Sequence, residues 1–477
     1  MIPLSHLTDG LPQGRPVPAE EIAALVTAGR RVLVVLDDDP TGTQSVADLP
    51  VLTGWSAQDL EWALTQGAKA VYVMTNSRSL DPAEAAQRNR EVARAALAAS
   101  AQTGVPVGFV SRGDSTLRGH FPLETDTLAE ELAAAGTPVD GVVLVPAFGD
   151  AGRITVHGVH YMGSAEQGYV PVGETEFAQD ATFGYAASAL ADWVQEKTGG
   201  RIAADDVVTI DAALLRTDED AVVERLLAVR GDAVVAPDCL EENDLRLLAL
   251  ALERAESAGR RFLYRVGPPF VRGRIGQDVH PPLTRADVDA IAATTSPRQD
   301  DDTAGLVVVG SHVGLTTRQL DALRSRRSPL EIEIDVAAVL GTDRDAHLSD
   351  VVDRAVAGLA TATTVVRTSR TLVKAESPQE SLDIARQVSA AVVEVVQRIV
   401  AARPPRFVIA KGGITSSDVA TLGLGIHRAF VRGPMLPGIV SLWEPVDGPA
   451  RGIPYVVFAG NVGGDESLAD VVDTLSS

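Results

Sequence analysis

The sequence predicts an α/β fold of two α/β domains with mostly parallel sheets, and an active site in the cleft between them. Short apolar runs alternate with longer stretches of helical spacing, such as Pro82–Ser100. The runs are continuously apolar, which is typical of parallel strands buried on both faces. At 477 residues, the chain is long enough for two or three ordinary domains.

The first half of the chain alternates between runs rich in Val, Leu and Ile and helical segments. The expected strands are Val32–Leu36, Ala70–Met74, Pro106–Val110, Val142–Val145, Val207–Ile210, Ala233–Ala236 and Arg261–Tyr264. The segment Thr294–Ala304 breaks the pattern with a proline and three consecutive aspartates. We therefore expect the domains to be residues 1–297 and 303–477.

The same alternation restarts after this boundary. The expected strands are Leu306–Val309, Glu331–Ile334, Thr364–Arg367, Phe407–Ala410 and Tyr455–Phe458, and the expected helices are Thr316–Arg326, Asp345–Ala360 and Pro378–Ala401. In open α/β sheets, ligands collect at the carboxyl ends of the strands. The loops that directly follow the apolar runs are therefore the first places to look for chemistry.

Composition excludes several classes of function. Acidic residues number 64 against 42 basic ones, a formal charge of -22, so binding to nucleic acid or to an anionic membrane works against long-range repulsion. A single cysteine, Cys239, excludes an intrachain disulfide and a zinc site made of several thiolates. The start of the chain is unlike a signal peptide and no run approaches the ~20 apolar residues of a membrane span. We expect a cytoplasmic protein.

Charged loops follow two strands of the first domain. The loop after Val32–Leu36 contributes Asp37, Asp38, Asp39, Thr41 and Gly42, and the loop after Pro106–Val110 contributes Arg112, Asp114, Ser115, Thr116 and Arg118. Arginine forks match carboxylates, while Asp, Ser and Thr bind hydroxyl groups. The loops therefore suit a polyhydroxylated acid, with solvated turns as the simpler interpretation. Arg153, in the loop Pro146–Tyr161, is a further candidate for the ligand.

Three strands of the second domain end in loops of small residues. These loops are Gly310–Thr316 with Ser311, Lys411–Asp418 with Gly412, Gly413, Ile414 and Thr415, and Ala459–Asp465 with Gly460, Asn461 and Gly463. Small residues let the backbone approach a ligand, and the amides at a helix start favour anions. The spacing differs from that of the P-loop. Three such loops in one domain favour a phosphate-binding crevice over coincidence.

Seven motifs, taken in order, resemble the four-carbon acid sugar kinase family over almost the entire chain. They are DDDPTGTQ, GDSTLRG, PAFGDAGRITVHGVHY, GPPFVRGR, GSHVGLTTRQL, AKGGITSSDVA and FAGNVGG. The resemblance implies a substrate-binding N-terminal domain, a nucleotide-binding C-terminal domain, and ATP-dependent phosphorylation of a tetronate or 3-oxo-tetronate in carbohydrate catabolism. It implies nucleotide contacts at Ser311, the Gly412–Thr415 turn and Gly460, and an acid-sugar site in the two charged loops.

Two departures from the family pattern both lie on the substrate side. The first loop is longer and more acidic than the family's form, and the basic residue often found two positions before Asp114 is Arg112 here. The acid itself, its stereoisomer and the accepting hydroxyl are therefore left open.

The resemblance lets roles be assigned within the loops. We expect Asp38 to be the general base, with Asp37, Asp39 and Asp114 as alternatives, because carboxylates packed together repel and the pKa of one rises. The simpler interpretation is that these aspartates only hydrogen-bond sugar hydroxyls. Arg112 and Arg118 are expected to bind the substrate carboxylate.

Lys411, one of only four lysines, is expected to reach the β- or γ-phosphate of ATP. The alternative is a solvated lysine whose stem covers the sheet. Mg²⁺ is the expected second cofactor because the charge of ATP requires it, and no carboxylate is assigned as its ligand. The expected partners are the acid sugar and ATP, with a homo-oligomer left open.

Two other functions compete with the kinase. Asp37, Asp39 and Thr41 also fit the D-x-D-x-T loop of haloacid-dehalogenase-like phosphatases, although a phosphatase leaves the second domain without a role. A non-catalytic sugar-acid sensor is the third interpretation, but a sensor has no need of three phosphate-type loops.

Overall fold

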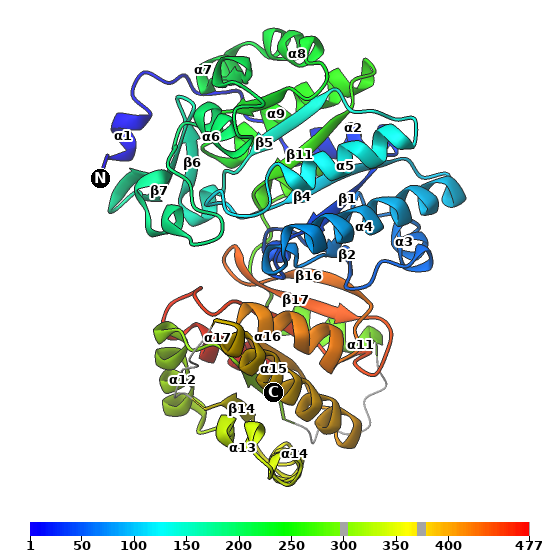
Figure 1. The fold of residues 1–477 in the computed structure, drawn as a ribbon, viewed down its shortest axis with the longest axis vertical. Helices are drawn as coiled ribbons and strands as arrows, with labels where there is room; N and C mark the ends of the chain where they lie inside the picture. Colours follow the sequence, from blue (N-terminus) through cyan, green and yellow to red (C-terminus); the bar gives the residue numbers. More distant parts are fainter. Residues whose placement is uncertain (296–303, 370–377, 477) are drawn as a thin grey trace. The chain divides into compact units, whose positions relative to one another are not determined.

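The computed structural model describes residues 1–295, 304–369 and 378–476. The chain divides into two compact units, Met1–His280 and Pro281–Ser477, and each contains both helices and strands (Figure 1). The boundary segment expected at Thr294–Ala304 lies largely outside the described residues, and the division into domains 1–297 and 303–477 stays a prediction. Within the described ranges, no helix is long and apolar enough to cross a membrane.

The first unit is built on a parallel sheet. Its strands are β1 (Val32–Asp37), β2 (Leu49–Leu52), β3 (Ala70–Met74), β4 (Val107–Arg112), β5 (Gly141–Val145), β9 (Val208–Ile210), β10 (Val234–Pro237) and β11 (Phe262–Val266). They lie in the order β2-β3-β1-β4-β11-β5-β10-β9. Every residue of the inner strand β1 is buried, which explains its uninterrupted apolar sequence up to Leu36.

Helices cover this sheet. They are α1 (Leu4–Leu7), α2 (Ala19–Gly29), α3 (Ala57–Leu64), α4 (Pro82–Thr103), α5 (Leu123–Ala134), α6 (Leu190–Lys197), α7 (Ala212–Thr217), α8 (Glu219–Ala228), α9 (Glu242–Ser257) and α10 (Pro269–Ile275). Helices α3, α4 and α5 lie next to one another and contribute Leu60, Val92 and Leu128 to one hydrophobic core with β1 and β3 (Figure 1). Asp81 caps the first amides of α4, and Gly104, at φ 69°, ends the helix.

A small antiparallel sheet also belongs to the first unit. It consists of β6 (Arg153–Val156), β7 (Val159–Ser164) and β8 (Gly168–Pro171). The sequence analysis treated this region as a loop, because its strands are short and are separated by glycine-containing turns. The sheet places Arg153 on a strand rather than in an irregular segment.

The second unit has a mixed sheet. Its strands are β12 (Leu306–Val309), β13 (Leu330–Ile334), β14 (Thr364–Thr368), β15 (Val408–Lys411), β16 (Arg428–Leu436), β17 (Ile439–Pro445) and β18 (Tyr455–Phe458), in the order β13-β14-β12-β15-β18-β17-β16. The strands from β13 to β18 in this order are parallel, and β17 is antiparallel to both of its neighbours. Every predicted strand is present in the two units, with ends that differ by no more than two residues.

The helices of the second unit are α11 (Arg285–Thr295), α12 (Gly314–Arg327), α13 (Val336–Leu340), α14 (Arg344–Gly358), α15 (Pro378–Ala402), α16 (Gly413–Asp418) and α17 (Ser467–Leu475). Its core packs Leu320 of α12 and Val472 of α17 against Val307 and Ile409 of the sheet, and Val288 of α11 joins this core. The fold therefore holds the carboxyl ends of β12, β15 and β18 in a fixed register.

Candidate active site

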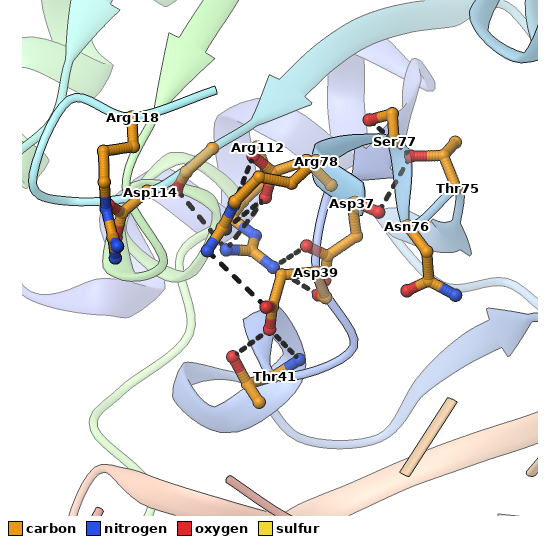
Figure 2. A network of polar contacts seen from close by, with 12 residues as sticks. Asp37, Asp39, Thr41, Thr75, Asn76, Ser77, Arg78, Arg112, Asp114 and Arg118 are labelled. Atoms are coloured by element: carbon orange, nitrogen blue, oxygen red, sulfur yellow. Dashed lines mark hydrogen bonds and ion pairs between the residues drawn. The ribbon is translucent and has the colours of Figure 1, made fainter. Parts of the chain in front are cut away.

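The charged loops of the first unit meet at one edge of the sheet. Asp37 at the end of β1 lies in register with Met74 of β3 and with Arg112 of β4, so the residues that follow these three strands come together. Figure 2 shows the resulting network, in which side chains from three loops point toward one another. The structure therefore brings together the two loops that the sequence singled out, and it adds the loop after β3.

Asp37 and Arg112 form a buried ion pair at the base of this network. Their side chains are 0% and 3% exposed, and Arg112 also donates to the Asp39 carbonyl. Burial lowers the pKa of Arg112 to about 9, which still leaves the guanidinium charged at neutral pH. A Cβ at Gly42 would lie 2.1 Å from Asp37 Oδ2 and 2.2 Å from Arg112 Nε, so only glycine fits there.

Asp38 pairs with Arg78, which the sequence analysis did not select. Arg78 Nη2 and Nε donate to the two carboxylate oxygens of Asp38 at 2.6 and 3.1 Å. Burial raises the pKa of Asp38 to about 6, and the charge of Arg78 opposes the rise. The direction agrees with the prediction, but the stated cause was wrong: removal from water raises this pKa, rather than repulsion from Asp37 and Asp39.

Asp39 shapes the turn that follows β1. Its Oδ1 accepts the Thr41 amide at 2.9 Å and the Thr41 hydroxyl, and its Oδ2 lies 3.5 Å from Arg78 Nη1. The local bonds to Thr41 are those of an Asp that initiates a turn. Asp39 is more exposed than Asp37 or Asp38, so one face of its carboxylate remains open to a ligand.

Asp114 is the most strongly ionised carboxylate of the network. Arg118 Nε donates to Asp114 Oδ2 at 2.7 Å, and the Thr116 hydroxyl donates to the same oxygen. Burial alone would raise the pKa of Asp114, but the charges of Arg78 and Arg118 and these hydrogen bonds hold it well below its usual range. Asp114 therefore stays an acceptor for hydroxyl groups and is a poor proton acceptor.

The backbone of the Asp114 loop is held in place from outside the loop. His160 Nε2 donates to the Ser115 carbonyl at 2.8 Å, and the Tyr185 hydroxyl donates to the Thr116 carbonyl at 2.6 Å. Leu117 adopts φ 66°, an unusual conformation for a branched residue, which these bonds help to maintain. Ser115 and Thr116 are both buried in this arrangement.

A second network lies beneath the loops, and the sequence analysis missed it. Arg265 of β11 pairs with Glu124 of α5 at 2.7 Å and donates to the Ser111 hydroxyl at 2.8 Å, and Ser77 also donates to Glu124. A Cβ at Gly113 would lie 2.3 Å from the Arg265 guanidinium carbon. The available signal was a charged residue inside the apolar run at Arg261–Tyr264 and its continuation, since a charge within a buried strand needs a partner.

Arg153 is the remaining predicted substrate residue of this unit. It opens β6 and donates to the Ala151 carbonyl through Nη1. Arg118, in contrast, is held between Asp114 and Asp180, whose Oδ2 lies 3.6 Å from Arg118 Nη1, and its guanidinium lies over the Phe177 ring at 4.9 Å. Arg112 and Arg118, the expected carboxylate ligands, thus both have internal partners.

The three glycine loops of the second unit also meet. Val309 of β12 lies in register with Lys411 of β15, and Lys411 with Phe458 of β18, so the loops after these strands are neighbours. A Cβ at Gly310 would lie 2.1 Å from Thr415 Oγ1, and a Cβ at Gly460 would lie 2.5 Å from Ser311 Oγ. The glycines are needed because the loops pack directly against each other.

Other residues of these loops are fixed from below or are open above. Thr316 donates to the Gly460 carbonyl at 3.0 Å, and Gln319 Nε2 donates to the Val462 carbonyl at 3.0 Å, which holds the chain on both sides of Asn461. Gly463 adopts φ 82°, where a side chain would be strained. A Cβ at Gly413 would meet no atom within 4 Å, so this position has room for a ligand. The backbone of Gly412, Gly413, Ile414 and Thr415 passes from the end of β15 into α16.

Lys411 is completely buried rather than solvated. Its Nζ donates to the Ala459 carbonyl at 2.6 Å and lies 3.8 Å from the centre of the Phe458 ring. Burial lowers the pKa of Lys411 to about 7. The interpretation as a solvated lysine is therefore wrong, and the ammonium supports the loop after β18 from within the sheet.

No cluster of three or more His, Cys, Asp or Glu side chains that could hold a metal ion occurs in the described ranges. The carboxylates of the first unit are instead matched with arginines. The residues of this chain thus provide no ready-made magnesium site.

Comparisons with known proteins give each unit a related domain. A model described as a sugar-binding N-terminal domain matches residues 33–274, and a model described as a nucleotide-binding C-terminal domain matches residues 306–468. The charged network lies within the first range, and the three glycine loops lie within the second.

Curated relatives match much of the chain. A D-erythronate kinase of Heliobacterium modesticaldum is 28% identical over 326 residues, which is 66% of this chain and 65% of the relative. A D-threonate kinase of Salmonella typhimurium is 23% identical over 460 residues, which is 92% of this chain and 97% of the relative. The first match thus spans just under two thirds of its relative, and the second spans nearly all.

Solved structures share the fold. A Haemophilus influenzae protein aligns with a TM-score of 0.63 at 17% identity, over 93% of this chain and all of its own. A Salmonella typhimurium protein aligns with a TM-score of 0.64 at 18% identity, over 92% of this chain and 98% of its own. The sugar-binding model alone matches half of the sequence, and the nucleotide-binding model matches most of the remainder. The chain belongs to the four-carbon acid sugar kinase family.

Proposed function

We propose that this protein is an ATP-dependent kinase that phosphorylates a hydroxyl group of a four-carbon acid sugar, a tetronate or 3-oxo-tetronate. One observation carries the proposal: the unit that matches a sugar-binding domain gathers carboxylates and arginines at one sheet edge, and the unit that matches a nucleotide-binding domain gathers three glycine loops. Ionised acceptors and arginines suit a polyhydroxylated anion. The relatives named D-erythronate and D-threonate kinase support the same acceptor class.

Asp38 is the best-suited general base among the four aspartates. Its pKa of about 6 leaves it mostly ionised at neutral pH while it retains affinity for a proton. Arg78 occupies two acceptor positions of this carboxylate, which has about four, so a substrate hydroxyl can use another. Asp37 is closed off by Arg112, and Asp114 is too acidic to take a proton readily. Asp39, Asp114, Thr41, Ser115 and Thr116 are proposed to bind the sugar.

ATP is proposed to bind the second unit, where it supplies the phosphoryl group, with Mg²⁺ shielding its charge. The open positions of Gly413 and Gly464, where an added Cβ would meet no atom within 4 Å, fit a ligand that lies against the backbone. Ser311, Thr415, Gly460, Asn461 and Gly463 would hold the phosphates, because backbone amides and hydroxyls bind such oxygens well. We propose that magnesium is held mainly by the nucleotide phosphates and water, as is usual for this ion.

The phosphatase alternative is not favoured. In that mechanism Asp37 would be the nucleophile, but its carboxylate is 0% exposed and paired with Arg112. The match of residues 306–468 to a nucleotide-binding domain also gives the second unit the role that a phosphatase would leave empty. A sensor without catalytic activity would not need a carboxylate with a pKa near neutrality.

An activity assay tests the proposal. The protein is incubated with ATP, Mg²⁺ and a panel of four-carbon sugar acids that includes D-threonate and D-erythronate, and ADP is measured. The proposal predicts ADP formation that depends on one of the acids. Release of inorganic phosphate from a sugar phosphate without ATP, or binding of an acid without turnover, would overturn it.

A further inference from the structure

We infer that Arg153, rather than Arg112 or Arg118, binds the carboxylate of the acid sugar. The inference rests on the proposed function, since it names the residue that recognises the acid end of that substrate. It follows from the way in which the arginines of the first unit are paired, from the position of Arg153 on β6, and from an unpartnered donor on its side chain.

Arg153 differs from the other arginines at this edge of the sheet in having no acidic partner. The paired arginines are Arg78 with Asp38, Arg112 with Asp37, Arg118 with Asp114 and Arg265 with Glu124. In the described part of the chain, no carboxylate lies within ion-pair distance of Arg153, whose only hydrogen bond runs to the Ala151 carbonyl. A half-buried guanidinium without a counter-ion is costly to keep unless it binds an anion.

The strand β6 directs Arg153 to the same side as the Asp114 loop. Side chains two residues apart on a strand share a face, so Arg153 and Thr155 lie on one side of β6. The Thr155 hydroxyl contacts His160 Nδ1 at 2.9 Å, and Nε2 of the same ring contacts the Ser115 carbonyl at 2.8 Å. This bridge fixes that face of β6 against the loop that carries Asp114.

The side chain of Arg153 also has an unused donor. Its Nε is buried and has no hydrogen-bond partner in the described part of the chain. A buried donor without an acceptor loses its hydration without compensation. Burial lowers the pKa of Arg153, while the charge of Asp114 raises it and that of Arg118 lowers it, so the three groups lie within one electrostatic neighbourhood.

A substrate carboxylate would satisfy both deficits at once. It would supply the missing negative charge and accept from the guanidinium in a charge-assisted hydrogen bond. Asp114, kept ionised by Arg118 and Thr116, would then accept a hydroxyl of the same molecule. The acid end and the hydroxyl end of the substrate are thus told apart by one unpaired cation and one ionised carboxylate.

Calorimetric binding of D-threonate and D-erythronate, together with the KM values for the acid and for ATP, tests the inference. Arg153→Gln keeps most of the stem and removes the charge, and we expect the Kd and KM for the acid to rise by about 10- to 100-fold, the loss of one charged hydrogen bond. The KM for ATP should stay within about twofold of wild type. Arg201→Gln is the matched control, since Arg201 pairs with the exposed Asp126 on the same unit.

Three outcomes separate the possibilities. An unchanged Kd for the acid in Arg153→Gln overturns the inference, as does an equal rise of both KM values, which would indicate a structural role. If Arg153→Gln does not fold, Arg153→Lys, which keeps the charge and loses the fork, is expected to weaken acid binding by about 10-fold. If the wild type binds the acid without phosphorylating it, the proposed function fails, and the loss of binding in Arg153→Gln would still support the role of Arg153.

Discussion

Two aspartates in neighbouring loops hold protons very differently because of their surroundings. Asp38 is buried with one arginine beside it, and its pKa rises to about 6. Asp114 has two arginine charges and a threonine hydroxyl near it, and its pKa falls well below the usual range. Environments that separate the pKa values of like groups are typical of sites that assign them different tasks. We therefore assign proton transfer to Asp38 and hydroxyl binding to Asp114.

The pH dependence of kcat/KM for the acid tests this assignment. The base must be ionised, so activity should be lost as the pH falls through about 6 and should be constant above that value. Asp38→Asn should lower kcat by about 100-fold or more, because it removes the proton acceptor. A variant with normal kcat and a raised KM would show instead that Asp38 only binds the sugar.

Lys411 gives a second prediction at the residue scale. Lys411→Met keeps the length of the side chain and removes the ammonium that donates to the Ala459 carbonyl. We expect nucleotide binding to weaken and turnover to fall by about 10- to 1000-fold, as for loss of one electrostatic contact in a phosphoryl-transfer site. The KM for the acid should not change. Kinetics with either substrate varied measures both effects, and wild-type turnover would remove Lys411 from the site.

At the scale of elements, the sequence was most informative where a strand ends in a loop. The run at Val32–Leu36 followed by Asp37–Asp39 located β1 and its charged end, because apolar runs and acidic loops are both local features. Arg78 and Glu124 were missed, since a single polar residue after a strand or in the first turn of a helix has no local pattern that distinguishes it. Their importance depends on partners about 40 or more positions away, Asp38 and Arg265.

The strands β6, β7 and β8 show a second limit. Glycine and histidine within Pro146–Tyr161 made the segment resemble a loop, whereas pairing between its own short strands and a bridge from Thr155 to Cys239 make it a sheet. The sequence selected Arg153 as a residue but not the face on which it lies. That face depends on strand register, which local composition does not specify.

The turn after β1 gives a prediction for an element. Gly42→Ala places a methyl group about 2 Å from Asp37 and Arg112, and we expect a loss of about 1 to 3 kcal/mol in the free energy of unfolding, together with loss of acid binding. Gly29→Ala at the end of α2 is the control, because its nearest contact would be 4.0 Å away. Thermal and denaturant unfolding of both variants measures the difference, and equal stability would mean that the buried ion pair adapts freely.

For the whole molecule, each unit has a hydrophobic core of its own and a cluster of site residues of its own. A ligand stabilises the state that binds it, so each substrate should protect the unit that holds it. Hydrogen exchange should slow at residues 37–42, 76–78 and 112–120 with the acid, and at residues 310–315, 411–416 and 459–464 with a non-hydrolysable ATP analogue. Protection of the first set by the nucleotide alone would contradict the assignment of sites to units.

The net charge of -22 also bears on the whole molecule, because both substrates are anions. Long-range repulsion disfavours them, so local positive charge must hold the acid, and the first unit concentrates arginines at the ends of β3 and β4 and on β6 for this purpose. Salt should therefore change acid binding less than it would in a protein that attracts anions at long range.

The central claim is direct phosphoryl transfer from ATP to a four-carbon acid sugar. ATP labelled with ¹⁸O at the non-bridging oxygens of the γ-phosphoryl group is incubated with the protein, Mg²⁺ and the acid that supports ADP release, and the products are analysed by mass spectrometry. The account predicts a monophosphate of the acid that carries all of these labelled oxygens, with ADP formed in equal amount. Labelled inorganic phosphate with no phosphorylated acid would contradict it.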